Sequence, residues 1–443
     1  MTAFEYWQYK GVGMKSKLVK LSEKPFIRNV LILTTGTAAA QAVTMALSPI
    51  ITRLYGPDEF GLLGMFTAVV GIITPIAALT YPIAIVLPKS DKEAKGLIRL
   101  SLSASVFISL VVALLLTLFN QDIIRVFNLE RISPYLYLIP IFILFTGLLE
   151  VTEQWLIRTK QFRLNANVSF YQAVILQSSK VGVGFFYPVA AMLITLTVFG
   201  QFLKTVMYIK SAKKSNYKHI YSEADNDENF PIIDLARKYK DFPVYRAPQS
   251  FIFALSQSLP ILLLASFFGP ISAGFYSLGR SVMGIPTSLI GKSIGDVFYP
   301  RISEAANNGE NLTSLIKKTI LVLAVVGIIP FGIVIVFGPS LFSLVFGLEW
   351  VKAGEYARWI ALGLFFTFIY QPCIKVFPVL SLQAFHLKFT FITLLINMLA
   401  LTTGYYMFSN DLIAITFLGI STAILNILLI ILTLRLTKKF DES

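Results

Sequence analysis

The sequence predicts an all-α integral membrane protein with twelve transmembrane helices in two six-helix lobes around a central cavity. Three observations lead to this fold class: the apolar composition, the number of long apolar runs, and a motif that occurs in both halves of the chain. Of the 443 residues, 56% are hydrophobic and only 14% are charged, and the mean hydropathy is +0.72. Soluble domains carry roughly a quarter charged residues, so an ordinary soluble protein is excluded.

The apolar runs give the number of helices. A helix needs roughly 20 apolar residues to cross a bilayer. The runs are continuous and do not alternate at every second residue, which favours helices over a β-barrel. We predict spans at residues 30–51, 61–87, 97–119, 132–156, 166–187, 189–209, 246–268, 272–299, 319–346, 357–379, 385–408 and 411–435.

The spans divide the chain into two halves. The predicted parts are a cytoplasmic segment (1–29), an N-lobe of helices 1–6 (30–209), a cytoplasmic linker (210–245), a C-lobe of helices 7–12 (246–435) and a cytoplasmic tail (436–443). Because each half has an even number of spans, the halves should be parallel repeats. Pro231 suits the first turn of a short interfacial helix in the linker, with Ile232, Ile233 and Leu235 toward the lipid.

Charge predicts the orientation in the membrane. The net charge is +14, and the basic residues cluster in alternate loops, so we expect both termini to be cytoplasmic and no nucleic-acid partner. The first 29 residues lack the apolar core of a signal peptide, and Met14 is a second plausible start. The single cysteine, Cys373, excludes an intrachain disulfide.

The repeated motif is RLYGPDEFG, Arg53–Gly61, with a shorter counterpart GPISAG at Gly269–Gly274. In both copies the glycine suits a helix cap, and the proline suits the first helical position, where no amide hydrogen is required. Asp58 and Glu59 then lie near the positive end of the helix dipole. The motif predicts a repeated helix start, and Arg53 has either a structural role or a contact with a phosphate at the outer rim.

Four stretches occur in an order and spacing typical of one family of membrane proteins. They are PIITRLYGPDEFGLLGMF (49–66), YPIAIVLPKSDKEAKGL (81–97), WLIRTKQFRLNAN (155–167) and the segment Phe242–Arg301. Together they resemble bacterial polysaccharide flippases, the Wzx-type lipid-linked oligosaccharide translocases. These belong to the multidrug/oligosaccharidyl-lipid/polysaccharide exporter superfamily.

The resemblance implies alternating access across the bacterial inner membrane, with no cofactor. The implied substrate is an undecaprenyl-pyrophosphate-linked oligosaccharide repeat unit, moved from the cytoplasmic to the periplasmic leaflet for O-antigen, capsule or exopolysaccharide synthesis. A polysaccharide polymerase and a chain-length regulator are the expected protein partners. Coupling to an H⁺ or Na⁺ gradient is implied for the superfamily, and no motif in this sequence identifies it.

Three basic residues within the spans are candidates for substrate binding, since a charge at a helix centre costs roughly 2.5–3.5 kcal/mol. Lys180 lies far along its span from the cytoplasm, so it suits a cavity, unless its amine extends to the outer surface. Arg280 matches an arginine that the resemblance implies, and a guanidinium can bind a pyrophosphate through paired hydrogen bonds. Lys292 is the third candidate. Together they predict a cationic cavity.

Three carboxylates within the spans are candidates for ion coupling. Asp296 lies four residues after Lys292 on the same predicted helix, so an ion pair between these two is the leading alternative. Glu150 and Glu153, near the inner end of span four, either bind a proton or Na⁺ or pair with Arg158 or interfacial lysines.

The function classes differ in what they require of the loops and of the deep charges. A membrane polysaccharide polymerase or ligase needs a sizeable extramembrane loop, and the outer loops here are short, so we expect no enzyme activity. A drug or cation antiporter of the same superfamily would have carboxylates as its main deep charges, whereas basic residues dominate here. His219 and His386 lack metal-ligand spacing, so no metal site is expected.

Overall fold

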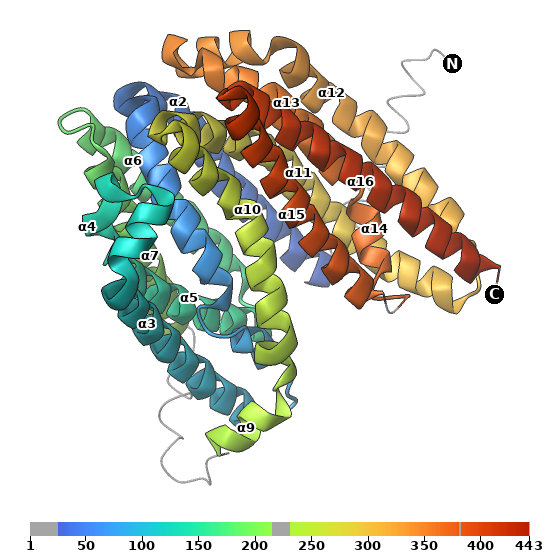
Figure 1. Ribbon diagram of the computed structural model, residues 1–443. Coiled ribbons are helices and arrows are strands. Elements are labelled where there is room, and N and C mark those ends of the chain that lie inside the picture. Colours follow the sequence, from blue (N-terminus) through green and yellow to red (C-terminus); the bar gives the residue numbers. More distant parts are fainter. Residues whose placement is uncertain (1–24, 215–230, 381, 443) are drawn as a thin grey trace, which may run out of the picture.

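A computed structural model describes residues 25–214, 231–380 and 382–442, without the side chains of 25–34, 213–214 and 288–297. The expectation about Met14 therefore lies outside the described residues. Within those ranges every regular element is a helix, and the helices form two lobes (Figure 1).

The N-lobe, blue to green in Figure 1, holds the first six spans. Its elements are α2 (Pro25–Ile73), η1 (Thr74–Ile76), η2 (Tyr81–Val86), α3 (Asp91–Phe127), η3 (Glu130–Ile132), α4 (Ser133–Leu136), α5 (Ile139–Arg158), α6 (Phe162–Gly184) and α7 (Ala190–Lys214).

The C-lobe, yellow to red, follows a linker that contains α9 (Ile232–Lys238) and the short π-helix η4 (Phe242–Arg246). Its elements are α10 (Ala247–Phe268), α11 (Pro270–Asn307), α12 (Leu312–Phe346), η5 (Leu348–Trp350), α13 (Val351–Ile369), α14 (Gln371–Val376), α15 (Gln383–Phe408) and α16 (Asp411–Asp441).

These helices account for all twelve predicted spans and confirm the fold class. In the described part of the chain, nine helical runs are long and apolar enough to cross a membrane. One of them, Thr35–Ile76, holds two spans because Gly56 interrupts α2, and the more polar α6 and α11 complete the set.

The two copies of the repeated turn have the same backbone conformation. Gly56 has φ 69° and ψ 173°, and Gly269 has φ 87° and ψ 172°. Glycine adopts a positive φ without a β-carbon clash. Pro57 and Pro270 each follow as the first residue of a helix, so the predicted repeated helix start is confirmed.

We call the face of the molecule that holds these turns the turn face, and the opposite face, where α2 begins and α16 ends, the termini face.

The second span, predicted as one helix over 61–87, is unwound in its last part. The α-helix ends before Pro75, and the rest forms 3₁₀ turns around Pro82, because neither proline can donate a backbone hydrogen bond. Thr80 adopts a left-handed φ of 59°. Its hydroxyl donates to the Phe242 carbonyl at 3.0 Å, which joins the unwound segment to η4 in the linker.

The linker contains the predicted short helix, α9, but one of its side chains faces away from the lipid. Ile232 and Ile233 are 42% and 67% exposed, as expected of an interfacial helix. Leu235 is instead buried in the apolar core of the N-lobe, so that part of the prediction is wrong. An ion pair between Lys238 and Glu93 of α3 holds α9 there.

Candidate functional site

The two repeated turns pack against each other and bring the lobes together at the turn face. A β-carbon added to Gly61 would lie 1.8 Å from the Pro270 carbonyl oxygen, and one added to Gly274 would lie 2.2 Å from the Pro57 carbonyl oxygen. Only glycine permits so close an approach at either position. The two helix starts therefore approach each other closely at these glycines, and the contact joins the two halves of the repeat.

Arg53 adds a second contact between the lobes at this face. Its guanidinium donates to the carbonyl oxygens of Leu344, at 2.8 Å, and Val345, at 3.1 Å, in the last turn of α12. These carbonyls have no partner within their own helix, so a cation there is well placed. In this conformation Arg53 fastens the N-lobe to the C-lobe, which agrees with the structural alternative for this residue.

A cavity of about 210 Å³ lies between the lobes, next to this closure. Phe60 connects the cavity with the closed turn face. It lines the cavity, and its ring packs edge-on against the Trp350 ring of the C-lobe, with the ring centroids 5.6 Å apart. The walls come from α2, α6, α7 and α11, which include the two more polar spans. The polar side chains in the walls are Gln41, Thr44, Ser48, Gln177, Lys180 and Ser281.

Lys180 is the only ionisable residue among the described residues that line this cavity. It is 8% exposed, and its amine forms no hydrogen bond or ion pair with any residue that the structure describes. Its position is fixed through the backbone, because the Tyr55 hydroxyl donates to the Lys180 carbonyl at 2.9 Å. An unpaired buried ammonium group is costly, so the lining suits an anionic ligand that would neutralise it.

Arg280 lies elsewhere. Its side chain donates to the Tyr276 hydroxyl at 3.2 Å and to the side-chain oxygen of Gln257 on α10. It lines a separate small pocket inside the C-lobe, together with residues of α13 and α16. Among the described residues, Arg280 and Lys180 line different cavities, and a contact between Arg280 and a substrate stays a prediction.

The other candidates on α11 are Lys292 and Asp296. The helix runs through both positions, but their side chains lie outside the described residues. Their predicted roles in substrate binding and ion coupling, and the alternative of an ion pair, stay predictions.

Glu150 and Glu153 lie within the N-lobe, on α5. Glu153 accepts a hydrogen bond from the Asn165 side chain of α6 at 3.3 Å, and Asn165 in turn accepts one from the Tyr208 hydroxyl of α7. Asn165 and Tyr208 are buried, so these groups form a polar cluster inside the lobe. The structure pairs Arg158 with Asp91 and with neither of these carboxylates, so one of the two partners suggested from the sequence, the other being interfacial lysines, is wrong.

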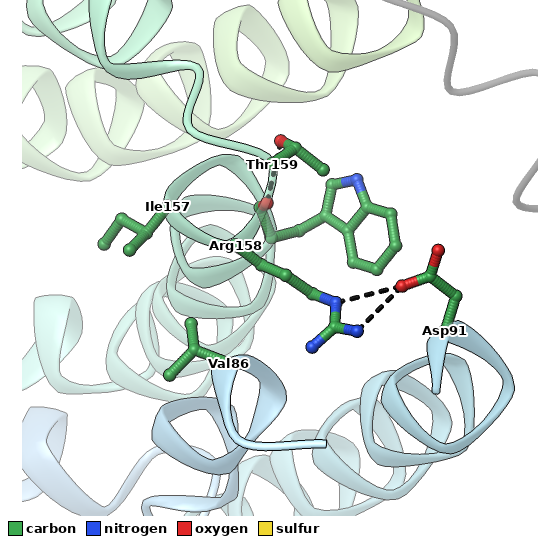
Figure 2. A pocket seen from close by; sticks show the side chains of 6 residues that line it. Val86, Asp91, Ile157, Arg158 and Thr159 are labelled. Atoms are coloured by element: carbon green, nitrogen blue, oxygen red, sulfur yellow. Dashed lines mark hydrogen bonds and ion pairs between the residues drawn. The ribbon is translucent and has the colours of Figure 1, made fainter. Parts of the chain in front are cut away.

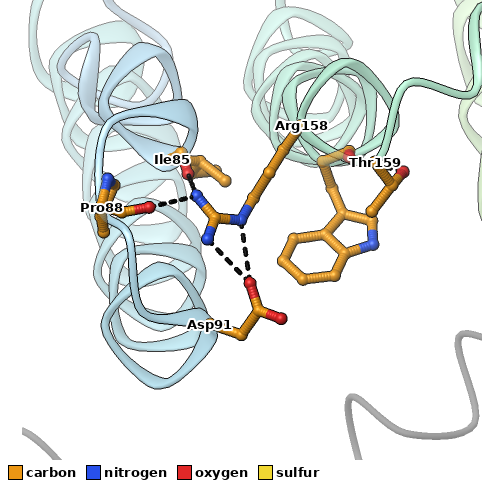
Figure 3. Close-up of polar contacts among 6 residues, drawn as sticks. Ile85, Pro88, Asp91, Arg158 and Thr159 are labelled. Atoms are coloured by element: carbon orange, nitrogen blue, oxygen red, sulfur yellow. Dashed lines mark hydrogen bonds and ion pairs between the residues drawn. The ribbon is translucent and has the colours of Figure 1, made fainter.

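Arg158 instead closes the termini-face end of the N-lobe. Its guanidinium donates to Asp91 at 2.7 and 3.2 Å and to the carbonyl oxygens of Ile85, at 3.1 Å, and Pro88, at 2.7 Å (Figure 3). A groove of about 490 Å³ passes beside Arg158 (Figure 2). Trp155 also lines this groove. With the Arg158 donors directed at these acceptors, we assign this residue a structural role.

Comparison with known proteins places this architecture in a family. The family described as "Polysaccharide biosynthesis protein" matches residues 50–355, which include both repeated turns and Lys180. The chain belongs to this family. No curated protein matches this sequence.

Solved transporter structures share the fold. An inward-facing multidrug resistance MATE family transporter of the MOP superfamily is 13% identical, with 91% of this chain and 96% of that chain covered and a TM-score of 0.70. The lipid II flippase MurJ, in an inward closed conformation, is 14% identical, with 91% and 87% covered and a TM-score of 0.72. A MOP superfamily transporter from Pyrococcus furiosus is 13% identical, with 96% of each chain covered and a TM-score of 0.53.

Five polar cavity residues of this family member were not singled out from the sequence. Gln41, Thr44 and Ser48 lie three and four residues apart in the first span, which is the spacing of one helix face. Gln177 lies three residues before Lys180, also on its face. Such polar stripes in otherwise apolar spans are a usable signal of a cavity, whereas charge alone identified only Lys180.

Proposed function

We propose that this protein is a flippase for a lipid-linked oligosaccharide. The observation that carries the proposal is the cavity between the lobes, whose one ionisable lining residue among those described, Lys180, has no partner within the protein. The family match and the fold shared with the lipid II flippase MurJ support it. The proposed substrate is an undecaprenyl-pyrophosphate-linked repeat unit of O-antigen, capsule or exopolysaccharide.

The lining suits the two chemical parts of such a head group. A pyrophosphate is anionic, so the Lys180 ammonium group would bind it through charge-assisted hydrogen bonds. The hydroxyl and amide groups of Ser48, Gln177 and Ser281 can donate to and accept from sugar hydroxyls. The apolar prenyl chain would stay in the bilayer, because transferring it from the lipid into a polar cavity is unfavourable.

The proposed orientation places the termini face in the cytoplasm and the turn face in the periplasm of a bacterial inner membrane. The distribution of basic residues in the loops supports this direction. Because the lobes touch at the turn face, delivery to the periplasmic leaflet requires the Gly61 and Gly274 contact and the Arg53 hydrogen bonds to separate.

For coupling, we propose Glu150 as the group that exchanges a proton or Na⁺, with Glu153 held beside it by Asn165. Imposing a pH or Na⁺ gradient on proteoliposomes should accelerate transport by the unmodified protein and not by Glu150→Gln. Equal acceleration of both would remove Glu150 from the coupling mechanism. A polymerase and a chain-length regulator remain the proposed protein partners.

The function can be tested by deleting the gene in its own bacterium. We expect lipid-linked repeat units to accumulate in the cytoplasmic leaflet and surface polysaccharide to be lost, with both reversed by the intact gene. Unchanged surface polysaccharide together with new sensitivity to cationic drugs would instead support a drug antiporter. Loss of polymer with normal appearance of single repeat units at the cell surface would indicate a polymerase.

A further inference from the structure

Phe60 belongs both to the central cavity and to the closure at the turn face. It is the only aromatic residue among the described residues that line the cavity. It is partly buried, and its side chain packs against the apolar cores of both lobes. A group bound in the cavity can therefore contact a ring that the two lobes share.

The second copy of the repeated turn shows that a helix start does not require this ring. Phe60 directly precedes Gly61 in the first copy. In the second copy the residue before Gly274 is Ala273, which is fully buried. The two turns nevertheless have the same backbone conformation. The aromatic ring of Phe60 therefore has a purpose other than the turn that the two copies have in common.

Trp350 is the partner of Phe60 in the C-lobe. The two rings are T-shaped, with an interplanar angle of 88°. The Trp350 indole also donates to the Thr52 carbonyl of the N-lobe at 3.2 Å, and Trp350 is only 1% exposed. Trp350 ends η5, which follows the end of α12 that Arg53 contacts. Residues 344–350 thus form the C-lobe half of the closure.

The proposed head group has a part that suits an aromatic ring. One face of many sugar rings carries C–H groups, which pack favourably on the electron-rich face of an aromatic side chain. Lys180 lines the same cavity and would hold the pyrophosphate beside such a sugar. The attraction between two aromatic rings depends on their geometry. A sugar that turns the Phe60 ring toward itself therefore weakens the pair with Trp350.

We propose that Phe60 is the positioning residue that couples binding of the head group to opening of the turn face. This inference rests on the proposed flippase function. A ligand shifts a conformational equilibrium only by binding one state more tightly than the other. The contact between the sugar and a Phe60 ring released from Trp350 provides that difference. The occupied cavity then favours separation of the lobes at residues 344–350.

Hydrogen exchange of the full-length protein in detergent measures this coupling. The probe is an undecaprenyl-pyrophosphate-linked oligosaccharide, and its binding to the same samples is measured in parallel. In the unmodified protein, the bound probe should raise amide exchange at residues 344–350 by about threefold or more. Phe60→Leu should still bind the probe, since Lys180 is intact, but the increase should disappear. Phe60→Tyr keeps an aromatic ring and should retain the increase.

Phe275→Leu is the matched control, because it removes another aromatic contact of Trp350. The Phe275 and Trp350 ring centroids are 6.0 Å apart, and Phe275 is not among the described residues of the cavity lining. The probe should therefore still raise exchange at residues 344–350 in this variant. In proteoliposomes, Phe60→Leu should lower the maximal transport rate more than it raises the KM, a split that a general loss of stability does not produce.

The outcomes separate this inference from the flippase function. An undiminished increase in Phe60→Leu would overturn the coupling role of Phe60 and leave the proposed function standing. Probe that binds to the unmodified protein without any increase at residues 344–350 would also overturn the coupling role, and this result does not depend on a variant that folds. Failure of the unmodified protein to bind the probe would instead overturn the proposed function, and this inference with it.

Discussion

Gly61 and Gly274 lie opposite each other where the lobes meet, and a β-carbon added to Gly274 would lie only 3.2 Å from the Gly61 α-carbon. Each glycine occupies the same place in its own copy of the repeated motif. The two copies therefore form a reciprocal contact, in which each helix start packs against the other. The turn that marks the repeat in the sequence is also the joint between the two halves of the fold.

Replacing Gly274 with alanine should disrupt this joint. The new methyl group would overlap the backbone of the other lobe, and such overpacking typically costs about 1–3 kcal/mol. We expect a lower unfolding temperature in detergent for Gly274→Ala and for Gly61→Ala. The matched control is Gly284→Ala, because nothing lies within 4 Å of a β-carbon at Gly284 on the same helix α11. Equal stability of the three variants would show that the lobes are not in contact there.

Removing the Arg53 side chain should favour opening at the turn face. Its exposed hydrogen bonds to Leu344 and Val345 join the lobes, and we assign them about 1 kcal/mol after solvent screening. Arg53→Ala should then speed labelling of a cysteine placed at Ser48 in the cavity by about fivefold. The reagent would be a membrane-impermeant maleimide, applied from the turn face.

Arg125→Ala is the matched control for this labelling experiment, since it removes another exposed cation from the same face. The native Cys373 is fully buried and should not contribute to the signal. A labelling rate that is unchanged in Arg53→Ala would show that Arg53 does not hold the lobes together.

The loop between α11 and α12 should make stability depend on acidity. Arg301 donates two hydrogen bonds to Glu310, at 2.5 and 3.1 Å. This hydrogen bonding from Arg301 lowers the pKa of the Glu310 carboxyl below its ordinary value. A carboxyl with a lowered folded-state pKa stabilises the fold above its unfolded pKa, and this stabilisation is lost as the pH falls through the folded pKa.

Glu310→Gln should therefore lower the unfolding temperature slightly at about pH 7, and the difference from the unmodified protein should shrink as the pH falls below about 4.3, the ordinary pKa of a glutamate carboxyl. The effect is small because the pair is exposed to solvent. Glu130→Gln removes an exposed carboxylate on the turn face and serves as the control. A difference that grows as the pH falls would have the wrong sign for this ion pair.

The fold was predictable because bilayer thickness and glycine geometry are local constraints that a sequence displays directly. The length of each apolar run gives the span, and the Gly56 and Gly269 turns give the repeat. The unwound end of the second span was missed, since prolines are tolerated in membrane helices, and the hydrogen bond that holds this segment joins Thr80 to Phe242, which lies 162 positions away in the sequence.

The candidate site was less predictable because depth in a span says nothing of the direction in which a side chain points. Lys180 and Arg280 are both basic and both at membrane depth, yet the first lines the central cavity and the second lines a pocket within the C-lobe. Leu235 gives the same lesson in the linker, where an apolar residue expected in lipid packs in the N-lobe core. Only tertiary packing separates these alternatives.

Transport by purified Lys180 variants tests the central claim most directly. The measurement is the rate at which proteoliposomes translocate a fluorescent undecaprenyl-pyrophosphate-linked oligosaccharide. Losing one charge-assisted hydrogen bond of about 1.5–3 kcal/mol should slow Lys180→Ala by about tenfold or more, while Lys180→Arg retains part of the rate. Lys317→Ala, which removes an exposed charge of α12, should match the unmodified protein. A rate for Lys180→Ala equal to that of Lys317→Ala would contradict the account.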